Sequence, residues 1–277
     1  MLRPIPRNMV RICVAAAICF AAALVAQQQQ NHDLGFKDTP ILPNQPWHVH
    51  DSDRPHPPVV TPATTPGAPP SDAVILFDGK DLSKWAQSAK GKIVEPKWRV
   101  EGDRFVAAPG SGDLFTRDKF GDCQLHVEWQ EPTTIKGTSQ DRGNSGIYLM
   151  SRYEVQVLDS YQSPTYADGQ AGAIYGQWPP LVNPARKLGE WNSYDIVFEA
   201  PKFDGDKLKE PAYITVFYNG VVVHNRKASY GATVYRQVAQ YARHEAKEPL
   251  QLQDHGHPVW FRNIWIRPLG QYDRSEK

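Results

Sequence analysis

The segment Arg142-Gly-Asn-Ser-Gly-Ile-Tyr-Leu-Met-Ser-Arg-Tyr-Glu-Val-Gln-Val-Leu-Asp159 is typical of a strand, a short turn and a second strand. The second strand alternates apolar with polar residues: Tyr153, Val155 and Val157 against Glu154 and Gln156. Because side chains alternate across a strand, the valines share one face and the two polar groups share the other. Two interpretations fit: a sheet that presents chemical groups on a rigid support, or an ordinary half-solvated sheet.

Further segments of this kind follow one another from residue 72 to residue 269. Asn219-Gly220 between two β-rich runs is typical of a hairpin, and Tyr235–Lys247 is the only candidate for an amphipathic helix. Many short antiparallel strands favour one all-β domain, a two-sheet antiparallel β-sandwich or jelly roll. We expect strands at Ala73–Phe77, Trp98–Val100, Arg104–Ala107, Asp122–Gln130, Gly146–Met150, Tyr153–Leu158, Ser193–Glu199, Tyr213–Tyr218, Val221–Asn225, Leu250–Gln253 and Val259–Arg267.

The first 26 residues have the pattern of a secretory signal peptide. Three arginines precede an apolar run of 15 residues, Ile12–Ala26. A membrane span needs about 20 apolar residues, so we expect a cleaved signal and a periplasmic or secreted protein without stable membrane insertion. Leu24 stands where a cleavage site has a small residue, which leaves an uncleaved N-terminal anchor as the alternative.

Residues 27–71 differ in composition from the rest of the chain. They begin with four glutamines and contain ten prolines, which predicts an extended or disordered linker; residues 270–277 form a polar tail. The 31 basic and 30 acidic residues give a net charge of +1, which becomes −2 when the three signal arginines are removed. This balance argues against nucleic-acid binding, which needs a concentrated basic face. Only Cys123 would remain, so no intramolecular disulfide could form.

Several polar residues stand where a sheet could present them to a ligand. His224 follows Val221–Val223 on a predicted strand, and Asp254-His255 follows another. Glycines in Asp168-Gly-Gln-Ala-Gly-Ala-Ile-Tyr175 would let a loop approach a ligand closely. Taken singly, these residues also fit a surface histidine or a turn. Together with Glu154 they supply carboxylates and imidazoles, which bind a divalent cation or perform acid–base catalysis.

Seven motifs follow one another in a specific order: Leu76-Phe-Asp-Gly-Lys-Asp-Leu-Ser-Lys-Trp85, Gly143-Asn-Ser-Gly-Ile-Tyr148, Arg152-Tyr-Glu-Val-Gln-Val157, Trp191-Asn-Ser-Tyr194, Asn219-Gly-Val-Val-Val-His224, Leu252-Gln-Asp-His255 and Phe261-Arg-Asn-Ile-Trp265. Their order resembles the 3-keto-disaccharide hydrolase domain family, long labelled only as a domain of unknown function. The resemblance covers about residues 72–269. It implies a concanavalin-A-like jelly roll of the lectin and glucanase type, in exported bacterial proteins that act on glycosides oxidised at C3 of the sugar.

The resemblance also implies a set of site residues. Glu154, His224 and His255 would be catalytic and would hold a divalent metal ion. A carboxylate with two imidazoles suits manganese, iron, cobalt or zinc better than calcium, which prefers oxygen ligands. The expected partner is a small carbohydrate, and the oligomeric state stays open. The residues expected to bind this substrate are Arg142, Asn144, Tyr148, Gln156, Asp168, Gln170, Tyr175 and Asp254.

The expected chemistry is removal of a proton from C2, which a ketone at C3 acidifies, followed by loss of the C1 substituent and addition of water. Glu154 and the histidines are suitable bases for it. Two alternatives remain. A jelly roll can be a non-catalytic carbohydrate-binding module, because a fold alone implies no activity. The spacing Glu154-x-Gln156-x-x-Asp159 also resembles the strand of retaining glycosidases, although the middle residue is an amide.

Overall fold

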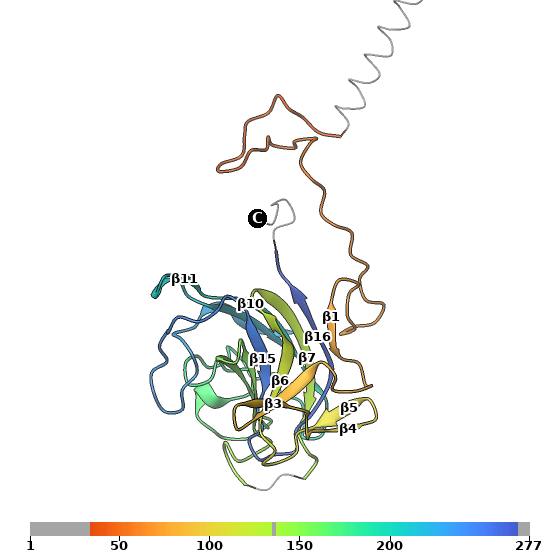
Figure 1. The fold of residues 1–277 in the computed structure, drawn as a ribbon, viewed down its shortest axis with the longest axis vertical. Coiled ribbons are helices and arrows are strands. Elements are labelled where there is room, and N and C mark those ends of the chain that lie inside the picture. Colours follow the sequence, from red (N-terminus) through yellow and green to blue (C-terminus); the bar gives the residue numbers. More distant parts are fainter. Residues whose placement is uncertain (1–33, 135–136, 271–277) are drawn as a thin grey trace, which may run out of the picture. The chain divides into compact units, whose positions relative to one another are not determined.

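The computed structural model describes residues 34–134 and 137–270, which fall into two compact units (Figure 1). Residues 34–59 form one unit, in which Ile41 and His48 make an isolated β-bridge. Val60–Gly270 form the second and larger unit. The expected signal peptide and the polar tail after Gly270 lie outside the described residues. No helix in the described ranges is long and apolar enough to span a membrane.

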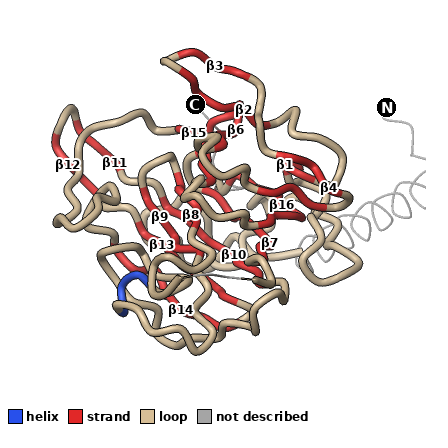
Figure 2. The backbone as a smooth tube through the Cα atoms, turned by 90° about the horizontal axis from the view of Figure 1, so that it is seen from below, coloured by secondary structure: helices blue, strands red, loops and turns tan. Residues whose placement is uncertain are grey.

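The larger unit is a two-sheet antiparallel β-sandwich, as the sequence predicts (Figure 2). Its larger sheet has the order β14 (Val221–Ala228), β13 (Tyr213–Tyr218), β10 (Asn192–Glu199), β7 (Cys123–Gln130), β16 (Trp260–Pro268), β5 (Arg104–Val106) and β4 (Arg99–Glu101), with β1 (Val74–Phe77) also paired to β16. The smaller sheet has the order β3 (Lys92–Val94), β2 (Trp85–Ala89), β6 (Leu114–Phe120), β15 (Glu248–Leu252), β8 (Ser145–Leu149) and β9 (Tyr153–Val157). The unit also contains a hairpin of β11 (Lys202–Asp204) and β12 (Lys207–Glu210) and a 3₁₀-helix, η1 (Ala167–Gly169).

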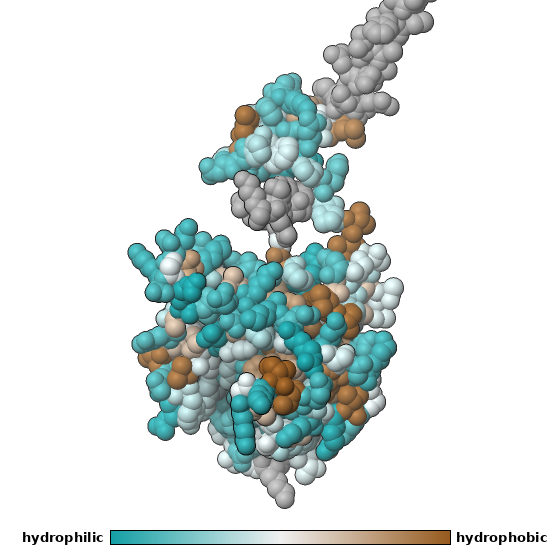
Figure 3. All heavy atoms as spheres, viewed as in Figure 1, coloured by the Kyte–Doolittle hydropathy of each residue, from teal (hydrophilic) through white to brown (hydrophobic). Residues whose placement is uncertain are grey.

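One hydrophobic core lies between the two sheets and contains side chains from both. Leu125, Val127 and Trp129 of β7 are fully buried, as their alternation with polar residues predicts. The Trp129 ring packs 5.4 Å from that of Tyr194 on the adjacent strand β10 and 5.9 Å from that of Tyr218 on β13, the next strand beyond it. Such aromatic pairs contribute beyond the area they bury. On the face shown in Figure 3, hydrophilic residues cover most of the surface.

Cys123, at the start of β7, belongs to this core. It is a free cysteine with almost no exposed surface, and burial raises the pKa of its thiol to about 12. The thiolate is the reactive form of cysteine, so this side chain is chemically inert.

The expected amphipathic helix is absent, and some strands escaped prediction. Tyr235–Lys247 contains no helix; it forms the greater part of a long loop between β14 and β15. Strands β2, β3, β6, β11 and β12 were not predicted. β6 reads Leu-Phe-Thr-Arg-Asp-Lys-Phe and shows no sustained alternation; its pairing with β2 and β15 makes it a strand.

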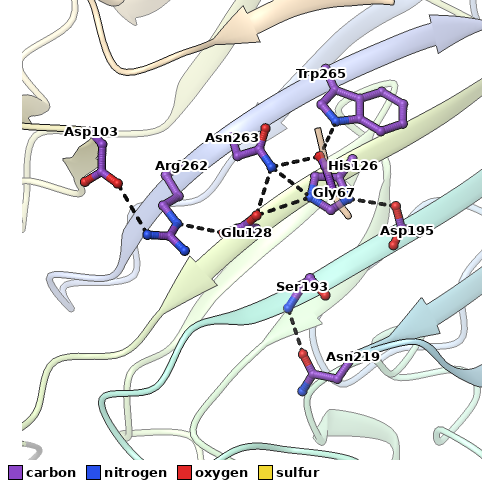
Figure 4. A network of polar contacts seen from close by, with 10 residues as sticks. All are labelled: Gly67, Asp103, His126, Glu128, Ser193, Asp195, Asn219, Arg262, Asn263 and Trp265. Atoms are coloured by element: carbon purple, nitrogen blue, oxygen red, sulfur yellow. Dashed lines mark hydrogen bonds and ion pairs between the residues drawn. The ribbon is translucent and has the colours of Figure 1, made fainter. Parts of the chain in front are cut away.

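A polar network covers part of the outer face of the larger sheet (Figure 4). His126 of β7 contacts Asp195 of β10 at 2.7 Å and stacks on Trp265. The Gly67 carbonyl accepts hydrogen bonds from Asn263 Nδ2 and Trp265 Nε1, both of 2.8 Å. The compact unit therefore includes residues 60–71.

This network keeps its histidine charged. Burial lowers the pKa of His126, but hydrogen bonds with Asp195 and Glu128 outweigh burial and raise it to about 9. The position of Gly67 depends on its lack of a side chain. Its φ is +79°, and a methyl group on it would lie 3.2 Å from His126 Nε2.

Candidate active site

The smaller sheet presents its polar residues in rows across neighbouring strands. Tyr148 of β8 pairs with Glu154 of β9 on one side and with Gln251 of β15 on the other. Gly146 pairs with Gln156 in the next row. Directly paired residues share a face, so Glu154, Tyr148 and Gln156 all lie on the face opposite the valines of β9. All five residues of β9 are buried, so its polar face is covered and is not the half-solvated face of an ordinary sheet.

A small polar pocket of about 140 Å³ lies on this face. Six of the expected site residues line it, from the strands β8 and β9 and the loops beside them. Its lining consists of Asn144, Tyr148, Glu154, Gln156, Tyr175, Thr233, Tyr235, Gln253 and His255.

Glu154 is the only carboxylate in the lining of this pocket. Its side chain is almost fully buried, and burial raises its pKa to about 8 although a hydrogen bond with Tyr148 lowers it. The backbone is held as well: Glu154 N donates to Thr233 Oγ1 at 3.1 Å, and its carbonyl accepts from Tyr175 N at 3.2 Å. A carboxyl with a pKa near the operating pH is suited to give and take protons.

The absence of a side chain at Gly146 makes room for this carboxyl. Gly146 has ordinary strand geometry, so its role is steric. A methyl group built on it would lie 2.8 Å from Tyr148 Cε2 and closer still to Glu154 Oε1. Any larger residue at this position would therefore displace Glu154 or Tyr148.

Two amide oxygens in the pocket lining have no partner in the structure. Gln156 donates its Nε2 to Gln140 at 2.8 Å, and Gln253 donates its Nε2 to the Tyr148 hydroxyl at 3.2 Å. The Oε1 atoms of Gln156 and Gln253 are buried and accept nothing. Buried acceptors are nearly always satisfied, so these two favour a ligand that carries hydroxyl groups.

His224 lies away from this pocket. It is buried on β14 of the larger sheet, and its Nε2–H donates to the Gly172 carbonyl at 2.9 Å. Burial lowers its pKa to about 4, so the ring is neutral at pH 7. Gly172 in turn donates its N–H to the Gln156 carbonyl. His224 thus supports the segment around Gly172, which runs beside β9. Glu154 and His255 line the pocket, and His224 does not.

We expect His224→Ala to reduce stability more than chemistry. The change leaves the Gly172 carbonyl without its donor, which costs about 1–3 kcal/mol for a buried group. Thermal unfolding should show a lower midpoint than wild type, and His224→Gln, which keeps a donor, should recover part of it. A His224→Ala protein that melts like wild type would contradict this role.

Four other expected substrate-binding residues also lie outside the pocket lining. Arg142 donates to the buried carboxylate of Asp159 through both Nε and Nη2. Asp254 accepts from the backbone N–H groups of Gly112 and Gly256 and so fixes a turn. The Nε2 of Gln170 donates to the Ser163 carbonyl, and Asp168 lines a neighbouring cavity.

Three lining residues were not in the expected set. Gln253 follows β15, and its place beside His255 could have been inferred from that strand's alternation. Thr233 and Tyr235 come from the loop between β14 and β15. No local sequence pattern predicts that these loop residues line the pocket. The loop is positioned by contacts of Thr233 with Arg152 and Glu154, which are far away in the sequence.

The donors in the pocket bear on the expected metal ion. Glu154 and His255 share the lining, and the two unpaired amide oxygens are further ligands of the kind a divalent cation uses. His224 is committed to Gly172, and within the described ranges no three His, Cys, Asp or Glu residues are grouped to hold a metal. The three-residue ligand set therefore does not match this geometry, and the need for a metal stays a prediction.

Comparison with known proteins identifies the fold family. The profile of a family described as 3-keto-alpha-glucoside-1,2-lyase-like domain matches residues 72–267. The chain belongs to this family. The expected resemblance is thereby confirmed, and the match coincides with the sandwich and its pocket.

Three relatives of this 3-keto-alpha-glucoside-1,2-lyase-like domain are informative. A Bacteroides thetaiotaomicron protein named 3-keto-disaccharide hydrolase is 26% identical over an alignment of 255 positions, which covers 71% of this chain and 78% of that protein. A solved Parabacteroides distasonis structure, designated a candidate glycosyl hydrolase, is 45% identical with a TM-score of 0.74 and covers 83% of this chain and 100% of its own. A second structure from that organism, designated in the same way, is 20% identical with a TM-score of 0.52, covers 72% of this chain and 94% of its own, and supports the fold alone.

Proposed function

We propose that this protein is an exported enzyme that cleaves the glycosidic bond of 3-keto-glycosides. The observation that carries the proposal is Glu154, a buried carboxyl whose pKa is raised to about 8, in the lining of a small polar pocket. Such a base is suited to remove a weakly acidic proton from a carbon atom, here C2 of the 3-keto sugar. Family membership and the names of two relatives support a glycoside as the substrate class.

The first half of the proposed reaction is an elimination. The Glu154 carboxylate takes the proton from C2, and the electron pair of that C–H bond forms an enediolate with the C3 carbonyl. The electrons then return to form a C1–C2 double bond, and the bond from C1 to the leaving oxygen breaks. His255, the exposed imidazole of the pocket, gives a proton to this oxygen.

The second half adds water. His255, which has lost its proton to the leaving oxygen, takes a proton from water, and the resulting hydroxide bonds to C1. Glu154 returns its proton to C2, so that one water is consumed, both side chains regain their starting states, and a 3-keto sugar and an alcohol are released. Negative charge develops on the C3 oxygen, and donors aimed at it lower the barrier most. The hydroxyl groups of Tyr148 and Thr233 contact Glu154 and can serve as such donors, while the oxygens of Gln156 and Gln253 accept from substrate hydroxyls.

A divalent cation held by the amide oxygens together with either Glu154 or His255 would supply Lewis-acid stabilisation of the developing enediolate, and the side chain that held it would not also carry a proton. The mixed nitrogen and oxygen donors favour manganese, iron, cobalt or zinc over calcium.

The retaining-glycosidase alternative lacks its second carboxylate. That mechanism needs two carboxyl groups about 5–5.5 Å apart on either side of the bond. Asp159, the expected partner of Glu154, is buried and bound to Arg142, and it does not line the pocket.

The test is incubation of the purified protein with a 3-keto-glucoside and with the same glucoside unoxidised, each with and without a chelator. We expect release of the alcohol and the 3-keto sugar from the oxidised substrate alone. Loss of turnover in chelator that returns with added metal would identify the cation. Binding without release would indicate a carbohydrate-binding module, and release from the unoxidised glucoside would indicate a glycosidase.

A further inference from the structure

A second, larger cavity adjoins the Glu154 pocket. It has a volume of about 470 Å³, which lies within the range of sites that hold small organic ligands. Tyr175 and Tyr235 line both cavities, so the two spaces meet at these side chains. On its other sides the larger cavity is bounded by Tyr166, Asp168 of η1 (blue in Figure 2), Gly176, Arg236, Gln237 and Val238.

The wall of this cavity exposes apolar surface. Tyr235 is 67% exposed and Val238 is 79% exposed, and both stand on the loop between β14 and β15. Tyr166 and Tyr175 form an edge-to-face pair, with ring centroids 6.2 Å apart and their hydroxyls 2.7 Å apart. Exposed apolar groups gathered around a cavity mark a surface that a ligand covers.

The loop that carries this wall is held in shape at both ends. Ala232 N donates to the Gln240 carbonyl, which closes its base, and Thr233 binds both Arg152 and Glu154 of the catalytic strand region. At its tip Arg236 has a φ of +58°, a conformation that residues other than glycine seldom adopt. A backbone held in this region often marks a functional site.

We propose that the larger cavity binds the leaving group of the substrate, and that it takes a ring with an apolar face, either a second sugar or an aromatic aglycone. The inference rests on the proposed function. The small pocket has room for little more than the sugar that reacts, so the C1 substituent must pass Tyr175 and Tyr235 into the adjoining space. Tyrosine rings stack on apolar ring faces, and Val238 extends that surface.

The first experiment compares three 3-keto-glucosides with methyl, phenyl and glucosyl leaving groups. Val238→Asp places a charge in the apolar wall without touching the Glu154 pocket. We expect kcat/KM to fall about tenfold or more for the phenyl and glucosyl substrates and less than twofold for the methyl substrate. A fall for only one of the two would identify which ring the cavity prefers. Comparing each variant with wild type on one substrate cancels the differing reactivity of the leaving groups.

Leu181→Asp is the matched control, because Leu181 is 70% exposed and does not line either cavity. It should leave all three substrates unchanged. Equal losses on all three substrates for Val238→Asp, or no loss on any, would overturn the inference.

A binding measurement separates this inference from the proposed function. Calorimetric titration measures the affinity for unoxidised phenyl glucoside and for unoxidised methyl glucoside, and it requires no turnover. If wild type cleaves none of the keto substrates yet binds phenyl glucoside more tightly than Val238→Asp does, the proposed function fails and the cavity assignment stands. If wild type cleaves the methyl substrate but Val238→Asp binds and cleaves every ligand like wild type, the reaction stands and the cavity assignment fails.

Discussion

Glu154→Gln is expected to lower kcat/KM for a 3-keto-glucoside by about 10²- to 10⁴-fold, the range for loss of a general base. The amide keeps the shape of the neutral carboxyl that burial favours, so the variant should melt close to wild type at neutral pH. The rate of product release and the thermal midpoint, measured on the same sample, check both parts.

Glu131→Gln is a matched control for this change. Glu131 is equally buried, and burial likewise raises its pKa to about 8, but it does not line the pocket. Its substitution should alter stability alone. Full activity in Glu154→Gln, or an equal loss in Glu131→Gln, would exclude Glu154 as the base.

The pH dependence follows from the same shift. A base acts when unprotonated, so the kcat/KM of wild type should rise with pH through about 8. Stability changes in the opposite sense. The folded state binds this proton more tightly than the unfolded state, so the contribution of Glu154 is greatest below about pH 4.5 and declines until about pH 8. Glu154→Gln should lack the rise in kcat/KM and should lose only the Glu154 share of the change in stability, because Glu131 contributes a similar decline.

Gly146→Ala is expected to reduce activity by about 10²-fold, the cost of moving a catalytic group by about 1 Å. The added methyl group meets Tyr148 and the Glu154 carboxyl, and β8 cannot move away because it is paired on both sides. Kinetics on a 3-keto-glucoside measure the effect, and thermal unfolding measures its structural cost.

Gly121→Ala tests whether crowding alone explains such a loss. Gly121 also has an ordinary backbone, and a methyl group there would lie 2.7 Å from the Ala246 carbonyl oxygen, away from the pocket. It should destabilise the protein and leave kcat/KM near wild type. Wild-type activity in Gly146→Ala would mean that Glu154 does not need its present position.

Strand alternation predicted the architecture and the face of the sheet on which the candidate site lies. In β9, period-two alternation places Glu154 and Gln156 opposite the valines, and the structure agrees because those valines pack in the core. β6 was missed because its sequence lacks that alternation, and only its neighbours in the sheet define it.

Residues positioned by distant contacts could not be predicted in this way. His224 stands on a strand as a ligand would, yet the Gly172 carbonyl, 52 residues earlier, occupies its ring nitrogen. Thr233 meets Glu154 across 79 residues of sequence. Side-chain periodicity describes which face a residue occupies, and it contains no information about which loop covers that face.

The inert thiol of Cys123 makes this sandwich convenient for spectroscopy. The described residues contain no other cysteine, and this one is buried and stays protonated. A single cysteine introduced at an exposed position, such as Val234 on the loop beside the two cavities, would therefore react selectively with a fluorescent or spin label. The label would report, in solution and in real time, whether that loop shifts when sugars arrive and leave.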